Sequence, residues 1–268
     1  MEYVVNSHPT YCYTAGKPLD AAKPTVVFIH GVLNDHSVWI LQSRWFANHG
    51  WNVLALDLPG HCRSAGPPPA SVEEAALFVV ALLDAAGVEK AALVGHSLGS
   101  LIALEAAARA PGRVTHLALV GTAYPMTVSP ALLDGAQNDP QRAITMVNNF
   151  SHALLAPPPS SLGPGTWLYG DSRALMRRVL ASNREANVFY IGFKACNDYA
   201  NGEAAMAAVQ CPTLFLLGDA DQMTPQRATR TLIGKAPKAR VVSVKAGHQL
   251  MREAPDEVLF ALKDLLEN

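Results

Sequence analysis

The chain has 268 residues and half of them are apolar, which is enough to bury the core of one large α/β domain with an insertion. Its formal net charge is −1 at pH 7 and no block of like charge occurs, so there is no electrostatic reason to expect a nucleic-acid partner. No stretch approaches the roughly 20 unbroken apolar residues of a membrane span, and the start of the chain lacks the basic and apolar segments of a signal peptide.

Short runs of apolar and β-branched residues predict the strands of a sheet. Each run is nearly continuous rather than alternating, as expected for strands that are covered on both faces. In chain order the predicted strands are residues 25–29, 52–56, 91–94, 114–120, 213–217 and 240–244.

Helical patterns lie between these strands. The helix predicted for residues 71–86 opens with the capping box Ser71-x-x-Glu74 and stops at a glycine, and residues 98–109 are rich in Ala and Leu. Thr224 followed by Pro225 predicts a cap and a helix that runs to about residue 235, and a last helix opens at residue 255. Strands that alternate with helices indicate a mainly parallel central sheet with helices on both faces.

The segment from about residue 123 to 208 breaks this alternation, because it contains no convincing strand. Helical patterns at 140–155, 172–183 and 187–199 are interrupted by prolines at 157–159 and by the Gly-Pro-Gly sequence at 163–165. An insertion after the carboxyl end of a strand lies over the edge where α/β proteins bind ligands. We therefore predict a core made of residues 1–122 and 209–268, covered by a helical cap made of residues 123–208.

Ser97 lies between two glycines, in Gly95-His96-Ser97-Leu98-Gly99, where a predicted strand meets a predicted helix. Serine is a favoured helix N-cap, so the pattern alone leaves a structural interpretation open. A nucleophile on a sharp strand-to-helix turn needs small residues two positions to either side. Such a turn also places the next N–H at a helix N-terminus, where a developing oxyanion is stabilised.

A serine nucleophile needs a base, and the base needs a third group that orients it. In a strand–turn–helix setting both should follow later strands, in the order acid and then histidine. Asp221 follows the strand predicted at 213–217, and His248 follows the strand predicted at 240–244. These placements predict a catalytic triad of Ser97, Asp221 and His248, with Asp219 as a rival acid.

Over nearly its whole length the chain resembles the α/β-hydrolase fold family. The motifs that carry the resemblance are the serine turn, Gly218-x-x-Asp221 with Pro225 beyond it, Gly247-His248 followed by Glu253 and Pro255, His30-Gly31 with Trp39 downstream, and the turn at residues 57–64, where Cys62 replaces the usual glycine. The resemblance implies that the acid lies three residues after the glycine, which favours Asp221 over Asp219. It also implies that the backbone N–H groups of Val32 and Leu98 form the oxyanion hole.

We expect a serine hydrolase that cleaves carboxylic esters of small to medium size through an acyl-enzyme. The cap carries many Met and aromatic side chains and its basic residues are matched by acids, so the substrate should be a mainly apolar small molecule. C–C bond hydrolases, lactonases and other acyl hydrolases are compatible with the same triad. A protein that binds a ligand on this scaffold without turnover is the alternative of another class.

Further expectations concern cofactors and single residues. The four cysteines lack metal-ligand spacing, so we expect reduced thiols in a cytoplasmic protein without a metal or cofactor. His96 is interpreted as a packing residue, and His30 as a residue that hydrogen-bonds within its own loop. The sequence makes no prediction of acyl preference or oligomeric state.

Overall fold

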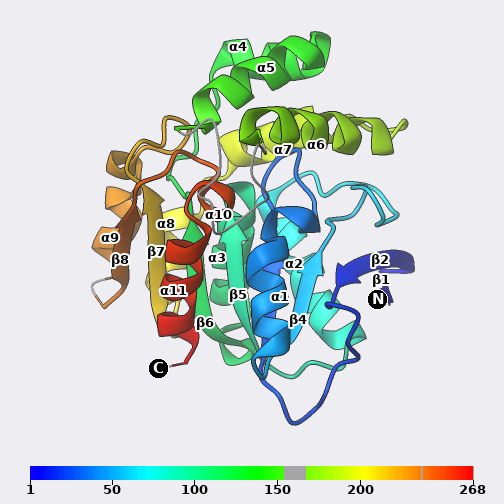
Figure 1. Ribbon diagram of the computed structural model, residues 1–268, viewed down its shortest axis with the longest axis vertical. Coiled ribbons are helices and arrows are strands. Elements are labelled where there is room, and N and C mark those ends of the chain that lie inside the picture. The colour runs from blue at the N-terminus through cyan, green and yellow to red at the C-terminus, as the bar shows by residue number, and fades with distance from the viewer. Residues whose placement is uncertain (154–166, 237, 268) are drawn as a thin grey trace.

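The computed structural model describes residues 1–153, 167–236 and 238–267. Its centre is an eight-stranded sheet with the order β1-β2-β4-β3-β5-β6-β7-β8 (Figure 1). The strands are β1 (Glu2–Val5), β2 (His8–Tyr13), β3 (Thr25–Ile29), β4 (Asn52–Leu56), β5 (Ala91–His96), β6 (Val114–Val120), β7 (Thr213–Gly218) and β8 (Arg240–Val244). From β4 to β8 every pairing is parallel, which confirms the predicted mainly parallel sheet.

The two N-terminal strands were not predicted. β1 and β2 pair antiparallel, and β2 then pairs antiparallel with β4 at the edge of the parallel sheet. Asn6 and Ser7 make the turn between them with φ angles of +49° and +70°, the left-handed conformation that a tight hairpin needs. Because this pair lacks the glycine of a typical hairpin turn, the sequence carries no clear signal for it.

The expectation that every predicted strand is covered on both faces is wrong for β8. Only Val244 of this strand is buried, because β8 is the last strand of the sheet and no further strand lies beyond it. By contrast, every residue of β3, β4, β5 and β7 is buried, as the continuous apolar runs predict.

Helices cover both faces of the sheet. α1 (Ile40–Asn48) and α11 (Pro255–Leu266) pack together on one face, and α2 (Val72–Ala85), α3 (Leu98–Arg109) and α8 (Gly202–Ala208) lie on the other (Figure 1). Ser71 caps α2 as predicted, since its hydroxyl accepts the Glu74 N–H at 3.2 Å. Instead of one helix from Thr224, the chain forms a 3-10 turn, η3 (Gln226–Thr229), followed by the short helix α9 (Arg230–Lys235).

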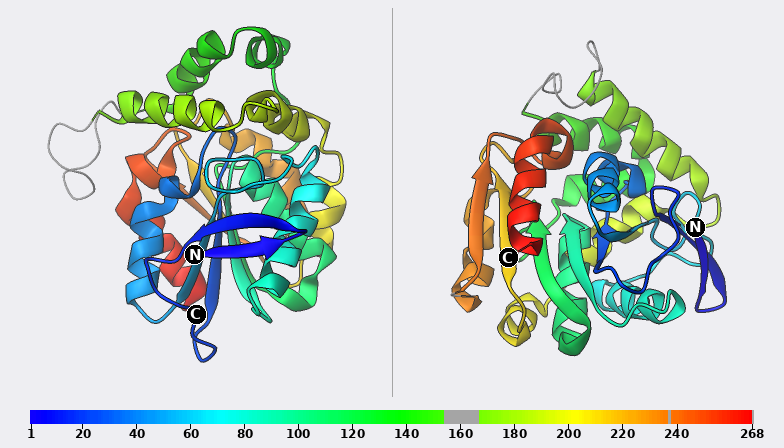
Figure 2. Two further views of the ribbon diagram at one scale, coloured as in Figure 1. Left: turned by 90° about the vertical axis from the view of Figure 1, so that its right-hand side faces the viewer. Right: turned by 60° about the horizontal axis from the view of Figure 1, so that its bottom comes forward.

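Four helices of the segment between β6 and β7 lie above the carboxyl edge of the sheet (Figures 1 and 2). They are α4 (Pro130–Asn138), α5 (Pro140–Ser151), α6 (Leu168–Ser182) and α7 (Val188–Asp198), and α4 was not predicted. The interruptions predicted at 157–159 and 163–165 lie outside the described residues. Within the described ranges, each helix is too short or too polar to cross a bilayer.

Candidate active site

Ser97 lies on a strained turn between β5 and α3. Its φ and ψ are +53° and −120°, a left-handed conformation that a residue with a side chain rarely adopts. The turn is so tight that only glycine fits two positions before Ser97 and two positions after it. A Cβ on Gly95 would lie 2.0 Å from the Gly99 carbonyl oxygen, and a Cβ on Gly99 would lie 2.4 Å from the Ile29 carbonyl oxygen. This geometry explains the glycines of the motif, and it argues against a simple helix cap, since the Ser97 side chain makes no cap hydrogen bond.

Two backbone N–H groups beside Ser97 are available to an oxyanion. Leu98 is the first residue of α3, so its N–H has no carbonyl one turn earlier to bond. Val32 lies in the loop after β3, and its N–H makes no hydrogen bond to the described backbone. The loop approaches Ser97 closely, because a Cβ on Gly31 would lie 3.0 Å from the Cβ of Ser97.

His248 and Asp221 form a buried pair at the ends of β8 and β7. Nδ1 of His248 lies 2.8 Å from Oδ2 of Asp221, and each residue is 5 % exposed. Oδ1 of Asp221 accepts the N–H groups of Met223 and Thr224, both at 2.8 Å. Burial tends to raise the pKa of the Asp221 carboxyl, but the charge and hydrogen bond of His248 and the bonds from Thr224 outweigh it and hold this pKa below its ordinary value.

Asp219, the rival acid, is exposed on the same turn and its backbone N–H donates to the Val244 carbonyl at 2.9 Å. No hydrogen bond or ion pair joins its carboxylate to a described residue. The geometry therefore favours Asp221 as the partner of His248.

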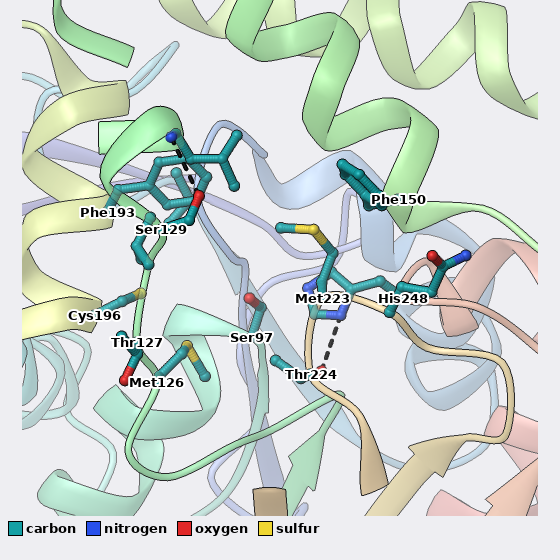
Figure 3. A pocket seen from close by; sticks show the side chains of 14 residues that line it. Ser97, Met126, Thr127, Ser129, Phe150, Phe193, Cys196, Met223, Thr224 and His248 are labelled. Carbon is teal, nitrogen blue, oxygen red and sulfur yellow. Dashed lines mark hydrogen bonds between the residues drawn. The ribbon is translucent and has the colours of Figure 1, made fainter. Parts of the chain in front are cut away.

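Thr224 has a different role from the predicted helix cap. Its hydroxyl lies 3.1 Å from Nδ1 of His248 (Figure 3). The same hydroxyl donates to Oδ2 of Asp221 at 2.7 Å, and the cap of η3 is Pro225. The hydroxyl proton is thereby used on the Asp221 carboxylate, in a charge-assisted hydrogen bond. Only the spacing Asp221-x-x-Thr224 could have suggested this contact in the sequence.

The backbone of His248 is held from two sides. Its N–H donates to the carbonyl of Ser151, at the end of α5, at 2.8 Å, and its carbonyl accepts Nε2–H of His96 at 2.8 Å. Burial lowers the pKa of His96 to about 3, so this ring is neutral at physiological pH. Besides the expected packing role, His96 therefore makes a hydrogen bond that fixes the loop of His248.

Glu253 connects the same loop to the cap. Its Oε1 accepts the Gly247 N–H at 3.2 Å and its Oε2 accepts the Ala153 N–H at 2.8 Å, and the residue is 1 % exposed. The carboxylate thus joins the residue before His248 to the chain that follows α5.

Ser97 and His248 line one cavity of about 270 Å³ under the cap (Figure 3). Within the described residues the Ser97 hydroxyl makes no hydrogen bond, to His248 included, and what the two side chains share is the wall of this cavity. Most of the lining is apolar, and no Lys, Arg, Asp or Glu belongs to its described part. The apolar lining residues are Val32, Met126, Val128, Leu132, Phe150, Phe193, Cys196 and Met223.

Two other sequence interpretations concern the loops beneath the cap. His30 does bond within its loop, through Nδ1 to the Gly31 carbonyl at 2.8 Å, but its Nε2 also accepts the Leu58 N–H at 3.1 Å from the neighbouring turn. In that turn Cys62 has a φ of +45°, the region that favours the glycine it replaces.

One group of potential metal ligands, Asp35, His36 and Asp57, lies in the described part of the chain. Its ligand atoms already have partners. Nδ1 of His36 lies 2.7 Å from Oδ1 of Asp57, and Oδ2 of Asp35 accepts a hydrogen bond from Arg178 of α6 at 2.7 Å. This network joins the core to the cap without needing an ion.

Comparison with known proteins identifies the family to which this fold belongs. A family model described as alpha/beta hydrolase fold matches residues 24–255. The chain is 30 % identical over 241 residues to the dihydrolipoyllysine-residue acetyltransferase component of the acetoin cleaving system of Pseudomonas putida, and the match covers 87 % of this chain but only 60 % of that protein. It is 27 % identical over 232 residues to a putative carbamate hydrolase, RutD, of Klebsiella pneumoniae, with 84 % of each chain covered. The solved structure of the enol-lactonase of Burkholderia xenovorans LB400 superposes over the whole of both chains, with a TM-score of 0.82 and 21 % identity.

Proposed function

Because the chain belongs to the alpha/beta hydrolase fold family, we propose that it is a serine hydrolase that cleaves carboxylic esters through an acyl-enzyme intermediate. One observation carries the proposal: the strained Ser97 turn and the His248–Asp221 pair meet at a single cavity. A nucleophile, a base and an orienting acid at one cavity are what acyl transfer requires.

In the proposed reaction, Ser97 Oγ attacks the ester carbonyl while Nε2 of His248 takes the hydroxyl proton. Asp221 accepts Nδ1–H of His248, which fixes the tautomer of the ring and stabilises the imidazolium. The N–H groups of Val32 and Leu98 stabilise the tetrahedral oxyanion, and each such donor contributes roughly 3 kcal/mol to catalysis. His248 then gives its proton to the leaving alcohol, and a water molecule activated by the same ring hydrolyses the acyl-enzyme.

The cavity supports a mainly apolar substrate of small to medium size. Its volume of about 270 Å³ and its Met and Phe lining suit an apolar acid or alcohol portion, and its lining carries no charged group among the described residues. We propose that residues 123–208 act as the cap of a core made of residues 1–122 and 209–268, since α4, α5 and α7 supply Leu132, Phe150 and Phe193 to the cavity wall. The four cysteines are free thiols, which supports the proposed cytoplasmic location.

Lactones, carbamates and the C–C bonds of ring-cleavage products could be attacked by the same serine. A panel that includes p-nitrophenyl butyrate, a γ-lactone, an aryl carbamate and a dienoate therefore decides the substrate class. We expect the ester to have the highest kcat/KM of these compounds.

Labelling by a fluorophosphonate tests the proposal directly. We expect rapid modification of Ser97, mapped by peptide mass spectrometry, and turnover of p-nitrophenyl butyrate. Ser97→Ala should lose both, whereas Ser243→Ala, on the exposed face of β8, should keep both. A folded wild-type protein that is neither labelled nor active would contradict the proposal and favour a ligand-binding protein on this scaffold.

A further inference from the structure

A second, smaller chamber of about 30 Å³ adjoins the large cavity at the nucleophile. Ser97, His248 and Val32 line both spaces, so the two meet where the proposed reaction places the scissile carbonyl. A carbonyl carbon under attack carries two substituents. One can extend into the large apolar cavity, and only a short one fits the small chamber.

The small chamber differs from the large cavity in its polar lining. Asn34 lines it from the loop after β3, and Gln249 is the residue directly after His248. Each of the two residues is only 4 % exposed. Neither side-chain amide makes a hydrogen bond to any described residue, and both side chains line the chamber. Each amide offers an NH₂ donor and a carbonyl acceptor that no described residue uses, so the two beside Ser97 suggest a ligand that satisfies them.

Two more polar atoms without partners belong to residues that line the same chamber. They are Nδ1 of His96 and Oγ of Ser151. The Nε2 of His96 donates to the His248 carbonyl, so its Nδ1 can only accept a hydrogen bond. Both atoms are enclosed by protein, so the amides of Asn34 and Gln249 supply the donors and acceptors that the chamber offers. Its described lining has no carboxylate, ammonium or guanidinium group that would pair with a charged ligand.

We propose that Asn34 and Gln249 determine specificity by hydrogen-bonding a short neutral polar group, a hydroxyl or an amide N–H, on one substituent of the scissile carbonyl. This inference rests on the proposed ester hydrolysis and narrows its substrate class: one side of the ester is apolar and of medium size, and the other is short and carries the polar group. A volume of about 30 Å³ holds roughly one or two water-sized groups, which limits the short side to a few non-hydrogen atoms.

Matched ester pairs test this inference. The first pair is p-nitrophenyl glycolate and p-nitrophenyl propionate, which differ by a hydroxyl in place of a methyl on the acyl side. The second is 2-hydroxyethyl and propyl hexanoate, which make the same change on the alcohol side. Each kcat/KM is divided by the rate of hydroxide-catalysed hydrolysis, so that intrinsic reactivity cancels.

We expect the wild-type protein to prefer the hydroxyl compound at least 10-fold in one of the two pairs, because a site built to hydrogen-bond a group discriminates against an analogue that lacks it. Asn34→Leu and Gln249→Met should each reduce this preference at least 3-fold, and the double variant should abolish it. Gln222→Met is the matched control, because Gln222 lines only the large cavity; it should keep the preference. Thermal melting and fluorophosphonate labelling establish that each variant is folded.

Three results would overturn the inference, and each has a different meaning for the proposed ester hydrolysis. A wild-type protein that turns over both members of each pair equally, with Ser97 labelled, refutes the specificity role and leaves the ester hydrolase standing. A preference that survives in the double variant, with the rates of both esters reduced alike, would show that the two amides position the attacking water and do not determine specificity. The absence of both turnover and labelling in the wild type removes the proposed function and this inference together.

Discussion

The Thr224 hydroxyl donates to Oδ2 of Asp221 at 2.7 Å, and the same oxygen lies 2.8 Å from Nδ1 of His248. The oxygen that orients the proposed base is therefore itself oriented by a neighbouring hydroxyl. Together with the two backbone N–H groups on Oδ1, this contact leaves the carboxylate one well-defined position.

Replacement of Thr224 by Val should lower kcat about 10-fold, because Oδ2 then loses one of its two donors and the imidazole is held less firmly. Thr224→Ser keeps the hydroxyl and should retain most of the activity. KM for p-nitrophenyl butyrate should change little in either variant. A Val variant that loses stability but not kcat would reduce Thr224 to a structural role.

Asp221→Asn should reduce kcat by roughly 10³ to 10⁴-fold, since an amide cannot stabilise the imidazolium and favours the wrong tautomer of His248. Asp219→Asn, two residues earlier on the exposed turn, is the matched control and should stay within about 2-fold of the wild type. Initial rates for both variants, measured on one ester, decide between the two acids. A larger loss at position 219 would transfer the role of the acid to Asp219.

The glycines around Ser97 should tolerate no side chain. Gly95→Ala should lower the free energy of unfolding by about 3 kcal/mol or more, because its Cβ would overlap the Gly99 carbonyl oxygen at 2.0 Å. Gly234→Ala serves as the control, since a Cβ there meets nothing within 4 Å and the residue lies in α9. Urea denaturation should show that the control gains about 0.5–1 kcal/mol. Equal effects at the two positions would contradict the close approach at the turn.

The ion pair between Asp35 and Arg178 should stabilise the docking of α6 on the core in a pH-dependent way. Burial tends to raise the pKa of the Asp35 carboxyl, but hydrogen bonds from Ser37 and Arg178 outweigh it and lower this pKa to about 2. A pKa lowered on folding contributes stability above the unfolded pKa near 4, and this contribution is lost as the pH falls toward 2. Arg178 is 62 % exposed, so solvent screens its part of the contribution.

Arg178→Met should therefore lower the free energy of unfolding by about 1 kcal/mol at pH 7. Its difference from the wild type should shrink as the pH falls from about 4 toward 2, because the unfolded chain binds a proton at Asp35 first and the folded carboxylate does so near pH 2. Arg177→Met removes the adjacent exposed guanidinium of α6 and should have no pH-dependent effect. Urea titrations at several pH values provide the test. A difference that is constant with pH would exclude the ion pair as its cause.

The sequence predicts the central strands well, because β3, β4, β5 and β7 are buried on both faces and need continuous apolar runs. It predicts the turn at Ser97 for a similar reason, since the motif requires glycines where no Cβ fits. The apolar pattern of the β1–β2 hairpin is weaker, because edge strands are short and partly exposed.

The residues that surround the proposed triad are harder to predict. Asp221 and His248 each follow a strand, so parallel order alone places them at one edge of the sheet. Asn34 and Gln249 are more than 200 positions apart, and nothing local to either one indicates that they line the same chamber. Their role depends on which loops the fold brings together, and this information is absent from short sequence patterns.

Ser151 and Glu253 have a consequence for attempts to exchange the lid of this protein for that of another. The Ser151 carbonyl holds the His248 amide, and the Glu253 carboxylate bonds both Gly247 and the amide of Ala153. A chimaera that replaces the insertion at its formal borders would therefore also remove the carbonyl that holds the backbone of His248, the proposed base. When the cap of another protein is inserted into this chain, residues 151–153 should be retained. Otherwise the inserted cap must supply an equivalent acceptor and amide if the chimaera is to stay active.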